Sequence, residues 1–295
     1  MSRRTSPSTH RPYGVARVVR EWELSRSTLY ARRARQAQPA RGRRGRPPAL
    51  DDAALLIAIR AVIAESPFHG EGHRKIWARL RALKGVRTSM RRVLRVMREA
   101  ALLAPARQPE PVVERPHAGT IVTDRPNVMW GTDATAAVTL AEGPATIFAA
   151  IDHCTAECVG IHAARHGDRF EALEPIRQGV RDHFGLAASA AHGLALRHDH
   201  GSVYLSGDFQ SEIAFLGMTS SPAFVRQPEG NGCIERFFRT LKEQLLWVRH
   251  FSTIDELRQA LLAFKETYNR EWLIARLGYR SPAQVRQAFA VKPAA

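Results

Sequence analysis

Three acidic residues stand in segments that suit a shared site: Asp133 in MWGTD, Asp199 in LRHDHGS and Glu235 in CIERFF. Between Asp199 and Glu235 lie 35 residues, and Lys242 follows Glu235 by seven positions. Seven positions are close to two α-helical turns, so the carboxylate and the ammonium would share one helix face. Carboxylate oxygens are preferred ligands of magnesium, and two such ions can stabilise both the attacking and the leaving oxygen of a phosphoryl transfer. The residue types and their spacing therefore indicate metal-dependent phosphoryl transfer.

The surroundings of the three carboxylates strengthen a pattern that spacing alone would leave weak, because Asp and Glu supply 28 of the 295 residues. Asp133 lies in WGTDATAAVTL, which is typical of a strand, and Asp199 ends the apolar run LALRHD before an HGS turn. Glu235 lies in CIERFFRTLKEQLLW, a helical pattern that follows PEGNG. A strand, the end of another strand and a helix can bring distant side chains to one point.

The same segments, with PEGNGCIERFFRTLK and the distal LGYRSPAQVR, resemble the integrase-core transposases of bacterial insertion sequences, in particular their second-frame products. The resemblance covers roughly residues 120–290, and a related helix-turn-helix pattern covers residues 55–105. It implies an α/β fold: an RNase H-like core with a mixed sheet flanked by helices, preceded by small all-α helix-turn-helix DNA-binding segments. It also implies a DDE triad and a basic residue two turns after the glutamate, which fall on Asp133, Asp199, Glu235 and Lys242.

The resemblance implies a DNA transposase that uses Mg²⁺ or Mn²⁺, as two ions, to cleave DNA and join strands. Asp133 and Asp199 would ligate the metals, with Asp133 as the bridge, and Glu235 would complete the second site. Lys242 would hold a DNA phosphate. The expected partners are double-stranded DNA at the element ends and target, further copies of the chain on paired ends, and a first-frame protein of the same element.

One segment departs from the resemblance. Many relatives carry Arg-Pro-His shortly after a Tyr-Asn pair, whereas here Tyr268-Asn269 is followed by Trp272, Leu273 and Ile274 at those places. A role for a distal histidine is therefore not expected. Two other functions stay open at this point: a DNA-binding regulator with an inactive RNase H-like core, and a structure-selective nuclease that never joins strands.

Positive charge is concentrated in the first third of the chain. Residues 1–108 hold 25 Lys and Arg against 7 Asp and Glu, a balance of +18, and residues 109–295 hold 19 against 21, a balance of −2. This asymmetry favours a DNA-binding arm joined to a near-neutral catalytic body. The basic start lacks a following apolar stretch, and three cysteines do not suit a disulfide framework. We expect a bacterial cytoplasmic protein that associates with the nucleoid and not with a membrane.

Composition shifts and helical patterns divide the chain further. The expected organisation is a basic helix-turn-helix-like segment at 1–35, an Arg/Gly/Pro linker at 36–50, a helix-turn-helix domain at 51–107, an extended linker at 108–126, an RNase H-like catalytic core at 127–250 and C-terminal helices at 251–295.

The last helix expected in the helix-turn-helix domain has the pattern of a recognition helix. Apolar residues recur at helical spacing from Met90 to Ala101, and the other side carries the arginines at 91, 92, 95 and 98. Thr88 or Ser89 would cap the helix. Contacts of Arg91, Arg92, Arg95 and Arg98 with the DNA major groove are predicted, with a solvated basic face as the alternative.

Two further sets of residues are candidate DNA contacts. Asn231 lies one helical turn before Glu235 and would touch DNA or orient the glutamate. Arg44 and Arg46 belong to an Arg-Gly-Arg-Pro tetrapeptide that resembles the AT-hook core, which reads narrow minor grooves. A flexible linker with general attraction to phosphates is the favoured reading of that segment.

Overall fold

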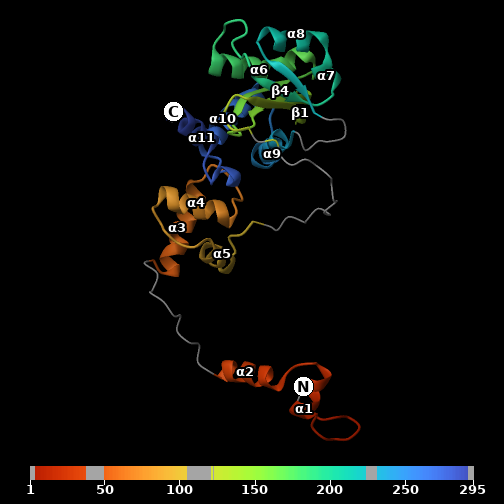
Figure 1. Cartoon of the computed structure of the whole chain (residues 1–295), viewed down its shortest axis with the longest axis vertical. Coiled ribbons are helices and arrows are strands. Elements are labelled where there is room, and N and C mark those ends of the chain that lie inside the picture. Colours follow the sequence, from red (N-terminus) through yellow and green to blue (C-terminus); the bar gives the residue numbers. More distant parts are fainter. Residues whose placement is uncertain (1–3, 38–49, 105–120, 122, 224–230, 292–295) are drawn as a thin grey trace. The chain divides into compact units, whose positions relative to one another are not determined.

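The computed structural model describes residues 4–37, 50–104, 121, 123–223 and 231–291 (Figure 1). The chain divides into two compact units, Met1–Asp51 and Asp52–Ala295. No helix among the described residues is long and apolar enough to cross a membrane.

The first unit contains two helices, α1 (Gly14–Glu21) and α2 (Arg26–Ala37). Glu23 takes a positive φ of 49° in the turn between them. Ser25 caps α2, because its Oγ accepts a hydrogen bond of 3.1 Å from the backbone N–H of Thr28. This segment thus consists of two helices joined by a turn at Glu23.

The second unit begins with a three-helix bundle, α3 (Asp52–Glu65), α4 (His73–Leu83) and α5 (Met90–Glu99). Ser89 caps α5 by accepting from the N–H of Arg92, as expected. The apolar stripe of α5 includes Val96, which is buried and was not part of the predicted stripe, whereas Leu94 is only half-buried. Helical spacing fills the bundle core with Leu55, Ile59, Val62, Ile76, Leu80, Val93, Val96 and Met97.

A five-stranded mixed sheet, with strand order β3-β2-β1-β4-β5, forms the centre of the catalytic core. Its first three strands form an antiparallel meander, and β4 and β5 add in parallel to the edge formed by β1. The strands are β1 (Met129–Thr139), β2 (Gly143–Asp152), β3 (Cys158–Ala164), β4 (Ala195–His198) and β5 (Thr219–Pro222). The predicted α/β class, a mixed sheet flanked by helices and preceded by helical segments, is confirmed.

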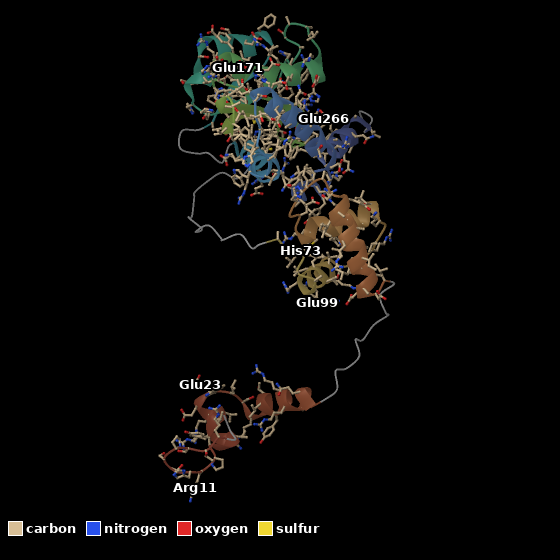
Figure 2. All side chains as sticks on the ribbon, turned by 180° about the vertical axis from the view of Figure 1, so that it is seen from behind. Arg11, Glu23, His73, Glu99, Glu171 and Glu266 are labelled. Atoms are coloured by element: carbon tan, nitrogen blue, oxygen red, sulfur yellow. The ribbon has the colours of Figure 1, made fainter. Side chains whose placement is uncertain are left out.

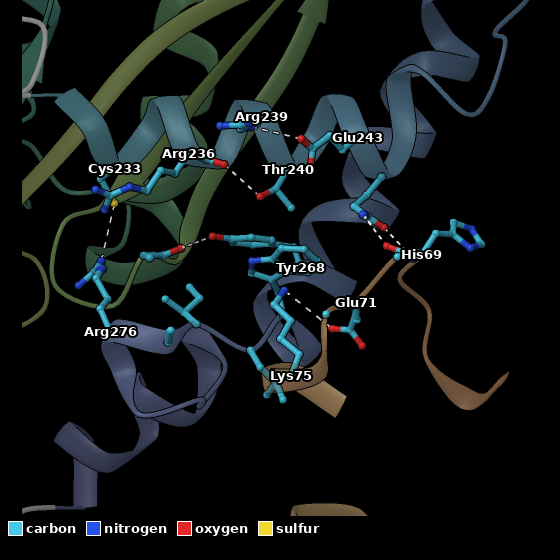
Figure 3. A pocket seen from close by; sticks show the side chains of 18 residues that line it. His69, Glu71, Lys75, Cys233, Arg236, Arg239, Thr240, Glu243, Tyr268 and Arg276 are labelled. Atoms are coloured by element: carbon cyan, nitrogen blue, oxygen red, sulfur yellow. Dashed lines mark hydrogen bonds and ion pairs between the residues drawn. The ribbon is translucent and has the colours of Figure 1, made fainter. Parts of the chain in front are cut away.

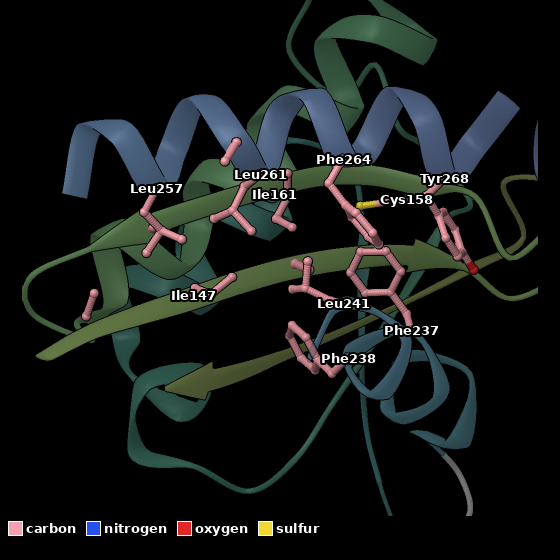
Figure 4. Close-up of a cluster of buried hydrophobic side chains, with 14 of the residues drawn as sticks. Ile147, Cys158, Ile161, Phe237, Phe238, Leu241, Leu257, Leu261, Phe264 and Tyr268 are labelled. Atoms are coloured by element: carbon pink, nitrogen blue, oxygen red, sulfur yellow. The ribbon is translucent and has the colours of Figure 1, made fainter. Parts of the chain in front are cut away.

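Helices cover both faces of this sheet. Successive side chains of β2 point to opposite faces, so its apolar residues pack against helices on each side. Phe148 and Ala150 face a cluster with α6 (Arg169–Phe184) and α8 (Gly207–Phe215), which includes the fully buried Trp130. Ile147, Ala149 and Ile151 face a second cluster with α9 (Gly232–Leu241) and α10 (Ile254–Glu271) (Figure 4). The remaining helical elements are α7 (Ser202–Leu205), the π-helical turn η2 (Lys242–Leu246), the 3₁₀ turn η3 (Ala275–Leu277) and α11 (Pro282–Val291).

Candidate active site

The two aspartates of the predicted triad lie on neighbouring strands. Strands β1 and β4 run parallel, and their last registered pair joins Gly131 to Arg197. Asp133 and Asp199 each follow that pair by two residues, so the register carries both carboxylates to the same level across adjacent strands. Asp133 lies within β1, opposite Ala149 of β2, and Asp199 lies just after β4 ends. The local pattern of strand and strand end in the sequence produces this placement.

The N-terminus of α9 crosses the same part of β1. Asn231 precedes the helix, is only 6% exposed, and donates from Nδ2 to the carbonyl oxygen of Thr132 at 3.1 Å. Gly131 permits this approach, since a Cβ there would lie 2.6 Å from the Oδ1 of Asn231. The helix is therefore tied to the residue immediately before Asp133, and Glu235 follows one turn later.

The charges of the other predicted site residues change the pKa of Asp133. Burial raises the pKa of Asp133 to about 6; its hydrogen bond from the N–H of Ala134 opposes the rise. The negative charges of Asp199 and Glu235 raise the pKa of Asp133 further, and the ammonium of Lys242 lowers it. The structure thus brings Asp133, Asp199, Glu235 and Lys242 into one electrostatic neighbourhood.

Lys242 lies where the α-helical pattern of the Glu235 segment changes. The helix α9 ends at Leu241, and Lys242 opens the π-helical turn η2. The N–H of Trp247 accordingly donates to the carbonyl oxygen of Lys242, five residues back. The sequence predicted one continuous helix here; the extra residue per turn is a local feature that apolar periodicity does not reveal.

Two residues beside the aspartates were not assigned a firm role from the sequence. His198 is fully buried, its Nδ1 lies 2.6 Å from the carbonyl oxygen of Asp199, and its Nε2 lies 2.9 Å from Ser220 Oγ. It therefore shapes the turn that presents Asp199. Tyr204 on α7 stacks on His198 with ring centres 5.6 Å apart. Burial and the charge of Asp133 both raise the pKa of Tyr204, so its hydroxyl remains protonated beside the site.

The donor set suits a hard divalent cation, because carboxylate oxygens are the ligands such ions prefer. Within the described residues, no three Asp, Glu, His or Cys side chains already form a metal-binding group. Asp199 and Glu235 have exposed side chains, whereas Asp133 is partly buried. The mutual repulsion that raises the pKa of Asp133 is the electrostatic condition that a bound cation would relieve.

The arginines of α5 divide into two pairs. Arg92 and Arg95 bind the carboxylate of Asp52 at the start of α3, with distances of 2.8 and 2.6 Å. Arg95 also pairs with Glu99, at the end of α5 (Figure 2). Arg91 and Arg98 are exposed. Sequence periodicity could not distinguish the two pairs, because it carries no information about the acid on α3.

Arg44, Arg46 and Asn231 are the remaining residues that the sequence analysis proposed as DNA contacts. Arg44 and Arg46 lie outside the described residues. The burial of Asn231 and its hydrogen bond to Thr132 favour the alternative in which this side chain positions the helix of Glu235.

The raised pKa of Asp133 predicts a pH-dependent stability difference. In the parent protein, an ionised Asp133 lowers the free energy of unfolding. This loss of stability should be absent below about pH 3.8, grow between pH 3.8 and about pH 6, and be complete above about pH 6. Without divalent metal, Asp133→Asn should therefore raise the free energy of unfolding at pH 8 by roughly 1–3 kcal/mol, a range reduced for the partial exposure of the side chain. The unfolding temperature at pH 8 should rise with it. Thermal unfolding in chelator at pH 4.5 and pH 8 measures this. An equal gain at both pH values would contradict the assigned cause.

The family comparisons identify the part of the chain built on this mixed sheet as an integrase-type core, a class of polynucleotidyl transferases. The integrase core domain model matches residues 216–282, and the HTH-like domain model matches residues 49–110. Transposase InsD for insertion element IS2A/D/F/H/I/K of Escherichia coli is 30% identical over 287 residues, covering 93% of this chain and 91% of InsD. The chain belongs to this family of insertion-element transposases, which confirms the resemblance seen in the sequence.

A further relative and two solved structures match parts of the chain. The insertion element IS2A uncharacterized 48.2 kDa protein of Escherichia coli is 30% identical over 292 residues; the match covers 95% of this chain but only 66% of that protein. The catalytic core domain of BIV integrase matches with 17% identity and a TM-score of 0.42, covering 56% of this chain and 96% of that chain. The HTLV-2 integrase catalytic core domain in complex with magnesium (trimeric form) matches with 16% identity and a TM-score of 0.41, covering 55% and 98%.

Proposed function

We propose that this chain is a DNA transposase that exposes 3′-hydroxyls at the ends of its element and joins them to another DNA strand. The observation that carries the proposal is geometric: Asp133 and Asp199 each lie two residues beyond the last registered pair of β1 and β4, and the helix of Glu235 is bonded through Asn231 to Thr132 beside them. Asp133 lies in β1, Asp199 just after β4, Glu235 in α9 and Lys242 in η2. Membership of the transposase family gives these separate positions a shared chemical meaning.

In this proposal Asp133, Asp199 and Glu235 hold the divalent ions, Mg²⁺ or Mn²⁺, with Asp133 as the shared ligand. Bound there, the ions would polarise the scissile phosphate and lower the pKa of the attacking water or hydroxyl. Asp133 is fixed by its strand and by the N–H of Ala134. Lys242 would place a phosphate of the DNA end as a point charge, since an ammonium offers no bidentate geometry.

The remaining parts of the chain would bind and arrange DNA. We assign the +18 balance of residues 1–108 to DNA contact, with the domain boundaries predicted from the sequence. On α5, Arg91 and Arg98 would reach the major groove, whereas Arg92 and Arg95 would do so only by leaving Asp52. We further propose action as a homo-multimer on paired ends in the bacterial cytoplasm, with a first-frame protein as an additional partner.

The test is a strand-joining assay with the whole chain, labelled DNA carrying the element ends, and Mg²⁺. We expect end cleavage followed by covalent joining to a second DNA, both abolished by chelator. A regulator with an inactive core would bind the ends without cutting them, and a nuclease of the same fold would cut without ever yielding joined product. Either of those two results would overturn the proposal.

A further inference from the structure

We propose that the loop and helix from Ser66 to Arg79 dock the helix-turn-helix bundle rigidly on the catalytic core, and that this docking sets which phosphodiester is cut. The inference rests on the proposed function and adds a specificity-determining surface to it. The docked surface consists of Phe68, His69, Lys75, Trp77 and Arg79 on one side and Gln244, Glu271, Trp272 and Tyr279 on the other.

An apolar contact forms the centre of this surface. Phe68, in the loop before α4, is 5% exposed and belongs to the same buried cluster as the side chains of α9 and α10. Its ring meets that of Trp272 edge to face, with centres 4.8 Å apart. Trp272 stands directly after α10, at one of the positions where the sequence departs from its relatives' Arg-Pro-His segment. A buried aromatic pair of this geometry is worth more than its area alone.

A second link connects the docking loop to the segment that carries Lys242. The side-chain amide of Gln244 accepts from the N–H of His69 at 2.8 Å and donates to its carbonyl oxygen at 3.0 Å (Figure 3). Gln244 lies in the π-helical turn η2, two residues after Lys242. The backbone of the docking loop is thereby bonded to the turn that presents the proposed phosphate-binding ammonium.

Charged side chains of α4 complete the docking. Arg79 is 5% exposed, binds Glu71 with its Nε at 2.6 Å, and donates to the carbonyl oxygen of Glu271 at 3.2 Å. That carbonyl belongs to the C-terminal end of α10, where a cation is favourable. Lys75 places its Nζ 2.7 Å from the centre of the Trp272 ring, and burial lowers the pKa of Lys75 to about 7. A fifth contact joins Trp77 to Tyr279, with ring centres 5.9 Å apart.

Several independent contacts over one short segment oppose hinge motion between the bundle and the core. The proposed recognition helix α5 packs in the same bundle as α4. Lys242 lies on η2, which receives the docking segment through Gln244, and Glu235 lies on α9, which leads directly into η2. A sequence read by α5 therefore lies at a fixed offset from the three carboxylates. Because reacting groups tolerate little displacement, that offset would select one phosphodiester.

The test compares the parent with Gln244→Ala, Trp272→Ala and the double variant, none of which alters a proposed metal ligand or α5. Products from end-labelled element DNA are mapped at single-nucleotide resolution. Since a displacement of about 1 Å costs roughly 100-fold in rate, we expect cleavage at the parental position to fall by roughly 10- to 100-fold in the double variant. New products should appear at neighbouring phosphodiesters, and affinity for the ends should stay close to that of the parent.

Leu173→Ala is the matched control, because Leu173 is buried with α6 in the cluster on the other face of the sheet. It destabilises the core without touching the docking surface, so its residual cleavage should remain at the parental position. If the double variant does not fold, the single variant Gln244→Ala carries the test, because Gln244 is only half-buried and its replacement should disturb the fold less. Residual product confined to the parental position in the docking variants would overturn the inference. A parent that cuts no ends would instead refute the proposed function.

Discussion

Replacing Asp133 or Asp199 by Asn, or Glu235 by Gln, is expected to lower end cleavage and strand joining by roughly 1000-fold or more. Each substitution keeps the size of the side chain and removes one negative charge from the group formed by Asp133 and the two carboxylates that act on it. Affinity for element ends should be retained, since the excess positive charge lies in residues 1–108. Strand joining and a gel-shift with the same labelled DNA measure the two effects separately.

Asp208→Asn is the matched control for this set. Asp208 lies on α8 of the same core, has an exposed side chain and pairs with Arg169, so its neutralisation removes a carboxylate away from the proposed site. Its joining rate should stay within a few-fold of the parent. Near-parental joining by any of the three triad variants would remove that residue from the list of metal ligands.

Gly160→Ala is expected to be the most damaging small substitution for the fold. A Cβ at Gly160 on β3 would lie 1.9 Å from the carbonyl oxygen of Pro175 on α6. Backbone cannot yield as a flexible side chain can, so strand and helix would have to separate. A loss of more than about 4 kcal/mol is expected, at the upper end of what single substitutions cause. Chemical denaturation, or the yield of folded protein, measures it.

Gly207→Ala is the control for the glycine substitution. Gly207 begins α8, and a Cβ there would meet no atom within 4 Å. Alanine also has the higher helix propensity, so the stability should be unchanged or slightly increased. If Gly160→Ala had the same free energy of unfolding as Gly207→Ala, β3 and α6 could separate at little cost, and the expectation would be wrong.

Local sequence pattern was sufficient for most elements of the fold. The continuous apolar run of β2 reflects burial on both faces of the sheet, and the helical spacing of α6 and α10 reflects burial of one helix face. The start of α5 followed from the capping residue Ser89. By contrast, the π-helical turn after α9 adds one residue per turn without disturbing the apolar pattern, so the sequence predicted a continuous helix.

Contacts between distant segments explain what the sequence could not provide. The three proposed triad residues were predicted because each lies in a distinctive local motif, whereas the placement of Asp133 beside Asp199 depends on the parallel register of β1 and β4. The burial of Asn231 depends on the carbonyl of Thr132, 99 positions away. The pairing of Arg92 and Arg95 with Asp52, and the packing of Phe68 on Trp272, likewise join residues that no periodicity relates.

The central claim is that Asp133, Asp199 and Glu235 form one metal-binding site, and calorimetric titration of the whole chain with Mg²⁺ tests it most directly. We predict saturable binding to the parent that weakens as pH falls through about 6, where Asp133 takes up a proton. Asp133→Asn, Asp199→Asn and Glu235→Gln should each weaken that binding, and Asp208→Asn should leave it unchanged. Parental Mg²⁺ affinity in any one of the three triad variants would contradict a single site built from these carboxylates.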